Sequence, residues 1–193
     1  MRLPFATDTT TSPTELSPAE MGTTRVYFAL WPSALVRTRL TKVVGRLSEV
    51  CGGRAIPAEL LHLSLVFVGE IPLTALPNLG IAAAATKGEP FDLRLTKFGC
   101  WHRKWLVWVA PDATPGALTM LVEELRKNLK EKHIRFDEKT FIPHVTLLRD
   151  AECKSVEMQV RPIHWHVSDF VLVRSILSKK GPDYKVIGRW TLG

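Results

Sequence analysis

The sequence predicts an α+β fold with antiparallel sheets, and three observations support this class. Short apolar stretches of strand length alternate with longer stretches in which apolar residues recur at helical spacing. The strand-like stretches follow one another as hairpins more often than as strand–helix–strand units, which favours antiparallel pairing. The chain has 193 residues, 46% of them hydrophobic and 23% charged, so it is long enough for one domain with a substantial core.

The individual elements are predicted from periodicity and from signals at their ends. Strands are expected at about residues 25–30, 61–68, 91–95, 105–110, 144–148, 166–177 and 184–192, and helices at about 33–52, 74–87 and 114–129. Ser33 is the expected N-cap of the first helix, which Gly52 and Gly53 end. Thr114 is the expected N-cap of the last helix, with Pro115 in its first turn.

We expect residues 1–23 to be a flexible N-terminal tail ahead of a domain that spans residues 24–193. The tail segment is rich in Thr, Ser and Pro, and it offers few apolar side chains to offset the entropy of ordering. A short element packed on the domain is the alternative. No secretory signal is expected, because the N-terminus has no continuous apolar core.

Composition also bears on location and partners. The longest uncharged stretch, residues 71–86, contains two prolines and a glycine and falls short of the ~20 apolar residues that span a bilayer. The net charge of +7 favours contact with polyanions such as RNA. Three widely spaced cysteines without a C-x-x-C pair are interpreted as reduced thiols: Cys51, Cys100 and Cys153. We therefore predict a cytoplasmic protein that does not bind membranes.

A short motif occurs twice, at residues 62–67 (HLSLVF) and 144–149 (HVTLLR), which begin 82 positions apart. Residues i and i+2 of a strand share a face, so one strand is expected to present His62 beside Ser64 and another to present His144 beside Thr146. The apolar residues between them would face the core. Two unrelated histidines in ordinary strands are the alternative interpretation.

The two motifs resemble the H-x-[ST]-x motifs of the 2H phosphoesterase superfamily. The chain is more specifically similar to the bacterial RNA 2′,3′-cyclic phosphodiesterases, also called 2′-5′ RNA ligases. The resemblance covers about residues 24–192 and rests on four runs: residues 25–30, 61–70, 141–150 and 184–192. Ser64 stands where the family usually has Thr, which keeps the hydroxyl. The resemblance implies a two-lobed, pseudo-twofold fold in which each lobe brings one histidine motif to a central cleft.

The resemblance also implies a chemistry that suits histidine, whose pKa lies near neutral pH. His144 would be the base that accepts a proton from water, and His62 the acid that protonates the leaving ribose oxygen of a 2′,3′-cyclic phosphate. The sequence alone does not order the two. Ser64 and Thr146 would donate hydrogen bonds to the non-bridging phosphate oxygens, where charge builds in the transition state.

One further residue lies five positions after each histidine: Phe67 after His62, and Arg149 after His144. The resemblance implies that Phe67 stacks on a nucleobase and that Arg149 contacts phosphate. Strict alternation turns both side chains away from the histidine face, so these roles require a bend or twist in each strand. A core aromatic and a surface salt bridge are the alternatives.

No cofactor and no metal site are predicted. The four other histidines lack the motif: His102, His133, His164 and His166. The last two could share a strand face and imitate a metal pair, but no carboxylate or cysteine stands at matching spacing. Several tryptophans could stack on RNA bases, among them Trp101 and Trp105, whereas Trp108 and Trp190 are expected in the core.

The sequence therefore predicts a monomeric, metal-independent hydrolase that acts on RNA or nucleotides with a 2′,3′-cyclic phosphate and leaves a 2′-phosphate, with possible reverse 2′-5′ ligation. Two alternatives remain open. One is a nucleotide- or RNA-binding module without activity, against which the completeness of both motifs argues. The other is a related esterase that acts on 2′-5′ oligoadenylate or on ADP-ribose cyclic phosphate.

Overall fold

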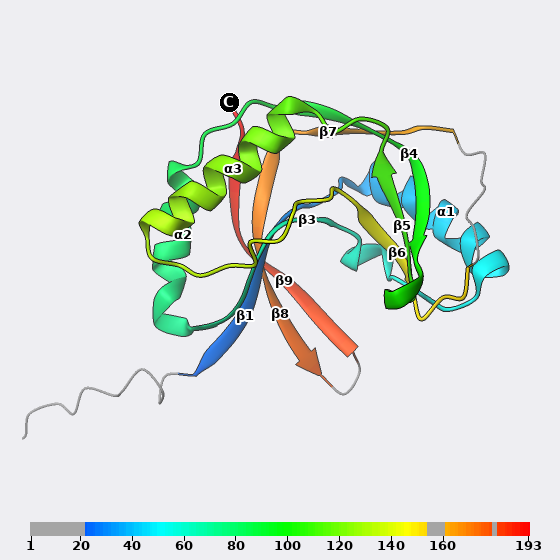
Figure 1. The fold of residues 1–193 in the computed structure, drawn as a ribbon, viewed down its shortest axis with the longest axis horizontal. Coiled ribbons are helices and arrows are strands. Elements are labelled where there is room, and N and C mark those ends of the chain that lie inside the picture. The colour runs from blue at the N-terminus through cyan, green and yellow to red at the C-terminus, as the bar shows by residue number, and fades with distance from the viewer. Residues whose placement is uncertain (1–21, 154–160, 179–180) are drawn as a thin grey trace, which may run out of the picture.

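The structure is a computed structural model that describes residues 22–153, 161–178 and 181–193 (Figure 1). The strands are β1 (Thr23–Leu30), β2 (Arg54–Ala55), β3 (Leu63–Pro72), β4 (Phe91–Trp101), β5 (Leu106–Pro111), β6 (Val145–Arg149), β7 (Ile163–Val167), β8 (Asp169–Ser178) and β9 (Gly181–Thr191). The α-helices are α1 (Ala34–Cys51), α2 (Leu76–Ala85) and α3 (Gly116–Glu131), and short 3₁₀ turns are η1 (Ala58–Leu60), η2 (Leu73–Ala75) and η3 (His102–Lys104).

All pairings in the described sheet are antiparallel, and its order is β7-β4-β5-β6-β3-β1-β8-β9, with β2 added beside β6. The sheet divides at its middle, because β3 and β6 pair through Leu63 and Val145 alone. Each half is a lobe: β3, β1, β8 and β9 form lobe 1, and β6, β5, β4 and β7 form lobe 2. The predicted two-lobed α+β class is confirmed.

The helices cover the lobes in a crossed arrangement. The unit β1–α1–β3 belongs to lobe 1, yet α1 packs on β6 and β7 of lobe 2. The unit β5–α3–β6 belongs to lobe 2, yet α3 packs on β3 of lobe 1 together with α2 (Figure 1). This exchange repeats one β–α–β pattern in both halves, and a single hydrophobic cluster runs through the two lobes.

Most predicted element ends agree with the structure. The Ser33 hydroxyl accepts a hydrogen bond from the backbone N–H of Val36 at 3.4 Å, so the predicted cap of α1 is confirmed. The predicted cap of α3 is wrong. Pro115 keeps an extended backbone with ψ at 141°, so the helix begins at Gly116 and Thr114 lies one residue too early to cap it. The strand expected at 166–177 is two strands, β7 and β8, which Ser168 separates.

Of the predicted tail, residues 1–21 lie outside the described part of the chain. Its last two residues belong to the fold: Thr23 starts β1, and the carbonyl of Gly22 accepts a hydrogen bond from the N–H of Leu73 at 3.2 Å. Within the described residues, no helix is long and apolar enough to cross a membrane.

The end of α1 approaches β6 very closely. Gly53 has φ at +81°, and a Cβ placed there would lie 2.6 Å from the carbonyl oxygen of Arg149. Glycine is therefore required where the chain leaves α1 and enters β2, which pairs with β6.

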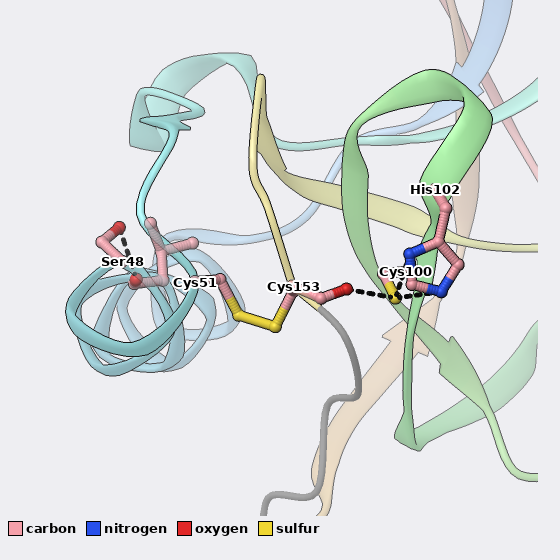
Figure 2. The surroundings of a disulfide bond; sticks show 6 residues. Ser48, Cys51, Cys100, His102 and Cys153 are labelled. Carbon is pink, nitrogen blue, oxygen red and sulfur yellow. Dashed lines mark hydrogen bonds between the residues drawn. A yellow bond between two sulfur atoms is a disulfide. The ribbon is translucent and has the colours of Figure 1, made fainter.

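This close approach explains why the prediction of three reduced cysteines is wrong. Cys51 and Cys153 form a disulfide, with Cα atoms 4.6 Å apart (Figure 2). Cys51 ends α1, and Cys153 follows β6, where the N–H of Glu152 donates to the carbonyl of Cys51 at 3.1 Å. A separation of 102 residues hides this contact from the sequence. Cys100 is a free thiol, and it donates to the carbonyl of Cys153 at 3.1 Å.

Candidate active site

A cleft of about 1580 Å³ lies where the two lobes meet, and both histidine motifs line it. The pairing of Leu63 with Val145 fixes their relation. Each histidine directly precedes a residue of this pair, and the motif hydroxyls of Ser64 and Thr146 directly follow one. Both histidines and both hydroxyls therefore lie beside the point where the two lobes are joined.

A β-bulge in each lobe brings the residues five positions after each histidine into the same cleft. In lobe 1, Ala29 pairs with Ser64 and Phe28 pairs with Val66, which leaves Leu65 as the extra residue. The bulge reverses the alternation, so Phe67 lines the cleft with His62 instead of pointing away from it.

Lobe 2 contains the same bulge at the equivalent position. Trp108 pairs with Thr146 and Val107 pairs with Leu148, which leaves Leu147 as the extra residue, 82 positions after Leu65. Arg149 consequently faces the cleft as Phe67 does. The bend that the roles of Phe67 and Arg149 require is thus present in both strands, and the structure brings all six predicted site residues into one cleft.

Both histidines are held by the same backbone contact. Nδ1 of His62 lies 2.7 Å from the carbonyl oxygen of Leu60, and Nδ1 of His144 lies 2.7 Å from that of Ile142. A carbonyl oxygen only accepts, so each Nδ1 must carry a hydrogen. Nε2 of each ring is therefore the nitrogen that takes up or releases a proton.

Three aromatic side chains of lobe 1 surround the half-buried ring of His62. Trp31 stacks on it with centroids 5.6 Å apart and an interplanar angle of 10°. The rings of Tyr27 and Tyr184 lie 5.0 and 5.5 Å away, Tyr184 edge-on. Desolvation by burial lowers the pKa of His62 to about 4, although the Leu60 carbonyl acts in the opposite direction.

His144 contacts fewer aromatic rings and has a cation nearby. The ring of Trp101 lies 4.5 Å from it in an edge-to-face arrangement. Burial lowers the pKa of His144, the carbonyl of Ile142 opposes this, and the positive charge of Lys104 lowers it further. In the unliganded protein both rings are therefore biased toward the neutral form.

The cleft is basic. Among the described residues, its lining includes six cations and no Asp or Glu: Arg25, Arg54, Arg103, Lys104, Lys139 and Arg149. Arg54 pairs with Asp150 at 3.1 Å, and Lys139 pairs with Asp137 at 2.8 Å. Within residues 22–153, 161–178 and 181–193, the other four make no ion pair, so their charge is available to an anion.

The described residues contain no group of three or more His, Cys, Asp or Glu placed to hold a metal ion. On β7, Nδ1 of His166 lies 2.9 Å from a carboxylate oxygen of Asp92 on the neighbouring strand β4. Independence from metal stays a prediction for experiment.

Sequence reasoning did not find the aromatic residues around His62. Tyr27 and Trp31 come from β1 and the residue that follows it, and Tyr184 comes from β9. Their position beside His62 follows from three long-range pairings, those of β1 with β3, of β1 with β8 and of β8 with β9. One signal was available: Arg25 and Tyr27 alternate on β1, the strand next to the first histidine motif. His102 lacks the motif but also lines the cleft.

Fold and site together define a two-lobed α+β protein with one motif histidine from each lobe in a basic cleft. The model of the 2′-5′ RNA ligase superfamily matches residues 32–177. The chain belongs to this superfamily.

Named relatives and solved structures agree with this assignment. The chain is 33% identical to the RNA 2′,3′-cyclic phosphodiesterase of Thermus thermophilus over 87% of its length and 90% of the relative's. It is 29% identical to the protein of that name from Escherichia coli, over 87% and 96% of the two chains. The crystal structure of E. coli LigT complexed with 3′-AMP matches with a TM-score of 0.78 at 27% identity, covering 89% of this chain and 99% of that one.

Proposed function

We propose that this protein hydrolyses 2′,3′-cyclic phosphate ends of RNA to 2′-phosphomonoesters. The observation that carries this proposal is the histidine pair, in which two Nδ1 atoms are fixed by carbonyls and two Nε2 atoms remain for proton transfer in a basic cleft. Relatives named RNA 2′,3′-cyclic phosphodiesterase over most of the chain support it. Because one chain supplies both histidines, we propose a monomer as the active unit.

The reaction needs one base and one acid on opposite sides of phosphorus. Water attacks the phosphorus atom while the bond from phosphorus to O3′ breaks. Nε2 of His144 accepts the proton that water loses, and Nε2 of His62 gives a proton to O3′. The product carries a 2′-phosphate and a free 3′-hydroxyl, and the histidine pair ends the cycle with its two proton states exchanged.

The phosphate itself helps to prepare the acid. The free protein disfavours a proton on His62, because its ring is desolvated and because His144 and Arg149 repel the positive charge. An anionic cyclic phosphate between the lobes supplies the opposite charge and raises the pKa of both rings. Substrate binding therefore favours the protonated form of His62 that donates to O3′.

The hydroxyls and the two residues brought in by the bulges bind and orient the substrate. Ser64 and Thr146 donate to the non-bridging oxygens, and Arg149 neutralises the charge that builds on them. Phe67 lines the cleft, is 37% exposed and has the guanidinium of Arg25 4.9 Å from its ring centroid, so its exposed area is the surface that we propose for a nucleobase. A base held there selects which ring oxygen faces His62. Run in reverse, the same arrangement lets a 5′-hydroxyl open the ring and form a 2′-5′ linkage.

Phosphorus NMR of a 2′,3′-cyclic mononucleotide incubated with the protein tests this function. We expect ring opening to the 2′-phosphate, with undiminished rate in excess chelator. Absence of ring opening on mononucleotide and on RNA ends would refute the hydrolase. A product that is mainly 3′-phosphate would refute the orientation but leave the histidine pair as the catalytic centre. Loss of activity in chelator, restored by a divalent ion, would refute metal independence.

A further inference from the structure

The tip of the β4–β5 hairpin forms the wall of the cleft beside His144. This hairpin tip, residues 101–106, contains the turn η3, and all of its residues except Trp105 line the cleft. The ring of Trp101 lies 4.5 Å from that of His144, and Nζ of Lys104 lies 5.1 Å from the Trp101 ring. The first residue of the hairpin tip, Trp101, therefore lies directly beside His144.

Trp105 is more exposed than a tryptophan side chain usually is. Its side chain is 52% exposed and belongs to neither hydrophobic cluster. Its backbone adopts a left-handed conformation with φ at 52°, and its carbonyl accepts from the N–H of Ala151 at 3.2 Å, which ties the turn to the loop after β6. The indole is thus presented to solvent by an anchored turn.

The neighbours of Trp105 distinguish it from the other exposed apolar side chains. Met120 and Ile81, for example, lie on helices outside the cleft. Trp105 instead follows Arg103 and Lys104, two cations that line the cleft and make no ion pair in the described part of the chain. Exposed aromatic rings beside unpaired cations are the features that bind single-stranded nucleic acid.

We propose that the hairpin tip binds the RNA chain upstream of the cyclic phosphate, with an upstream base stacked on Trp105 and the backbone phosphate on Arg103. The proposal rests on the proposed function, because the cyclic end must lie between the histidines for the chain to run over the hairpin. Phe67 on the opposite wall takes the terminal base, and the two walls together select oligonucleotides over mononucleotides. RNA fits this surface better than an acidic protein segment does, because such a segment would need neither the exposed aromatic ring nor a binding path that starts at the histidine pair.

The test compares a 2′,3′-cyclic mononucleotide with a short oligoribonucleotide that ends in the same cyclic nucleotide. Trp105→Ala is expected to lower kcat/KM for the oligonucleotide about tenfold, while turnover of the mononucleotide changes less than about twofold. Arg103→Ala is expected to lower kcat/KM more for the oligonucleotide than for the mononucleotide, because Arg103 also lines the cleft. Lys104 is left intact, since it affects the pKa of His144. Met120→Ala and Lys132→Ala, exposed changes on and after α3, are the matched controls and should alter neither substrate.

Binding without turnover separates this inference from the proposed function. Fluorescence anisotropy with an oligoribonucleotide ending in a 2′-phosphate should show weaker binding for both hairpin variants. Arg103→Ala should also reduce the slope of log affinity against log salt by about 0.7, the loss of one phosphate contact on a single strand. Wild-type affinity and wild-type oligonucleotide turnover in both variants would overturn the hairpin site, as would equal losses on the two substrates. A wild-type protein that binds RNA at the hairpin tip but opens no ring would overturn the proposed function instead.

Discussion

The two lobes repeat one backbone arrangement but differ in the side chains around the histidine. Each lobe has a histidine fixed through Nδ1 by a carbonyl two residues earlier, a hydroxyl two residues later and a bulge at the next position. In lobe 1 three aromatic rings contact His62, whereas in lobe 2 one ring and the charge of Lys104 act on His144. The repeated backbone places the two imidazoles in corresponding positions. The different side chains around them give the two rings different environments, as one acid and one base require.

Removing either imidazole tests whether both lobes contribute to catalysis. His62→Ala and His144→Ala are each expected to lower kcat by at least ~10²-fold, because each deletes one proton-transfer partner. The double variant should be little worse than either single one, since the two act as a unit. Steady-state kinetics and circular dichroism on the same samples check this. Full activity in a folded single variant would contradict the shared mechanism.

A disulfide joins α1 to the loop after β6 of lobe 2, and breaking it is expected to have the second largest effect, on stability. The disulfide closes a loop of 102 residues, so Cys51→Ser is expected to lower the free energy of unfolding by about 2–4 kcal/mol. Urea titration with and without reductant measures this, and reductant should not affect the variant. Cys100→Ser is the control that keeps the bond. Three free thiols in the unreduced wild-type protein would contradict the disulfide.

Phe67 and Arg149 occupy equivalent positions with different chemistry, so their variants should separate the functions of the lobes. Arg149→Ala is expected to lower kcat/KM about tenfold for every cyclic phosphate, because it removes charge from the phosphate site. Phe67→Ala is expected to raise KM by a similar factor only where a base is present. Ribose 2′,3′-cyclic phosphate, which has no base, is the matched substrate. Equal losses of both variants on this substrate would contradict the assignment.

The sequence predicted the features that repeat and missed those that depend on long-range contacts. The period of two indicated that each histidine shares a strand face with its hydroxyl partner, and the resemblance implied that the two motifs meet in one cleft, which both of them line. A bend in each strand was required by the roles that the resemblance implies for Phe67 and Arg149, but the apolar pattern did not locate it, because Leu65 and Leu147 are each followed by another buried apolar residue, as in an unbroken buried strand. The disulfide was missed for a similar reason: only the packing of α1 on the opposite lobe brings its cysteines together.

The smallest expected effect is on how the free energy of unfolding depends on pH, to which the histidines of the two lobes should contribute unequally. The pKa of His62 is about 4 in the folded protein and about 6.5 in the unfolded chain. Between these values the unfolded chain binds more protons, so stability falls as the pH is lowered through this window. His62→Ala removes this penalty, and between pH 7 and pH 5 it should lose less stability than the wild type by about 1–2 kcal/mol. His144→Ala should remove a smaller part, because one aromatic ring rather than three contacts that imidazole.

Urea titrations at the two pH values measure the differences, and carboxylates common to all three proteins cancel. Parallel losses in wild type and His62→Ala would show that burial does not lower the pKa of His62, and the inequivalence of the two histidines would then have to come from the substrate alone.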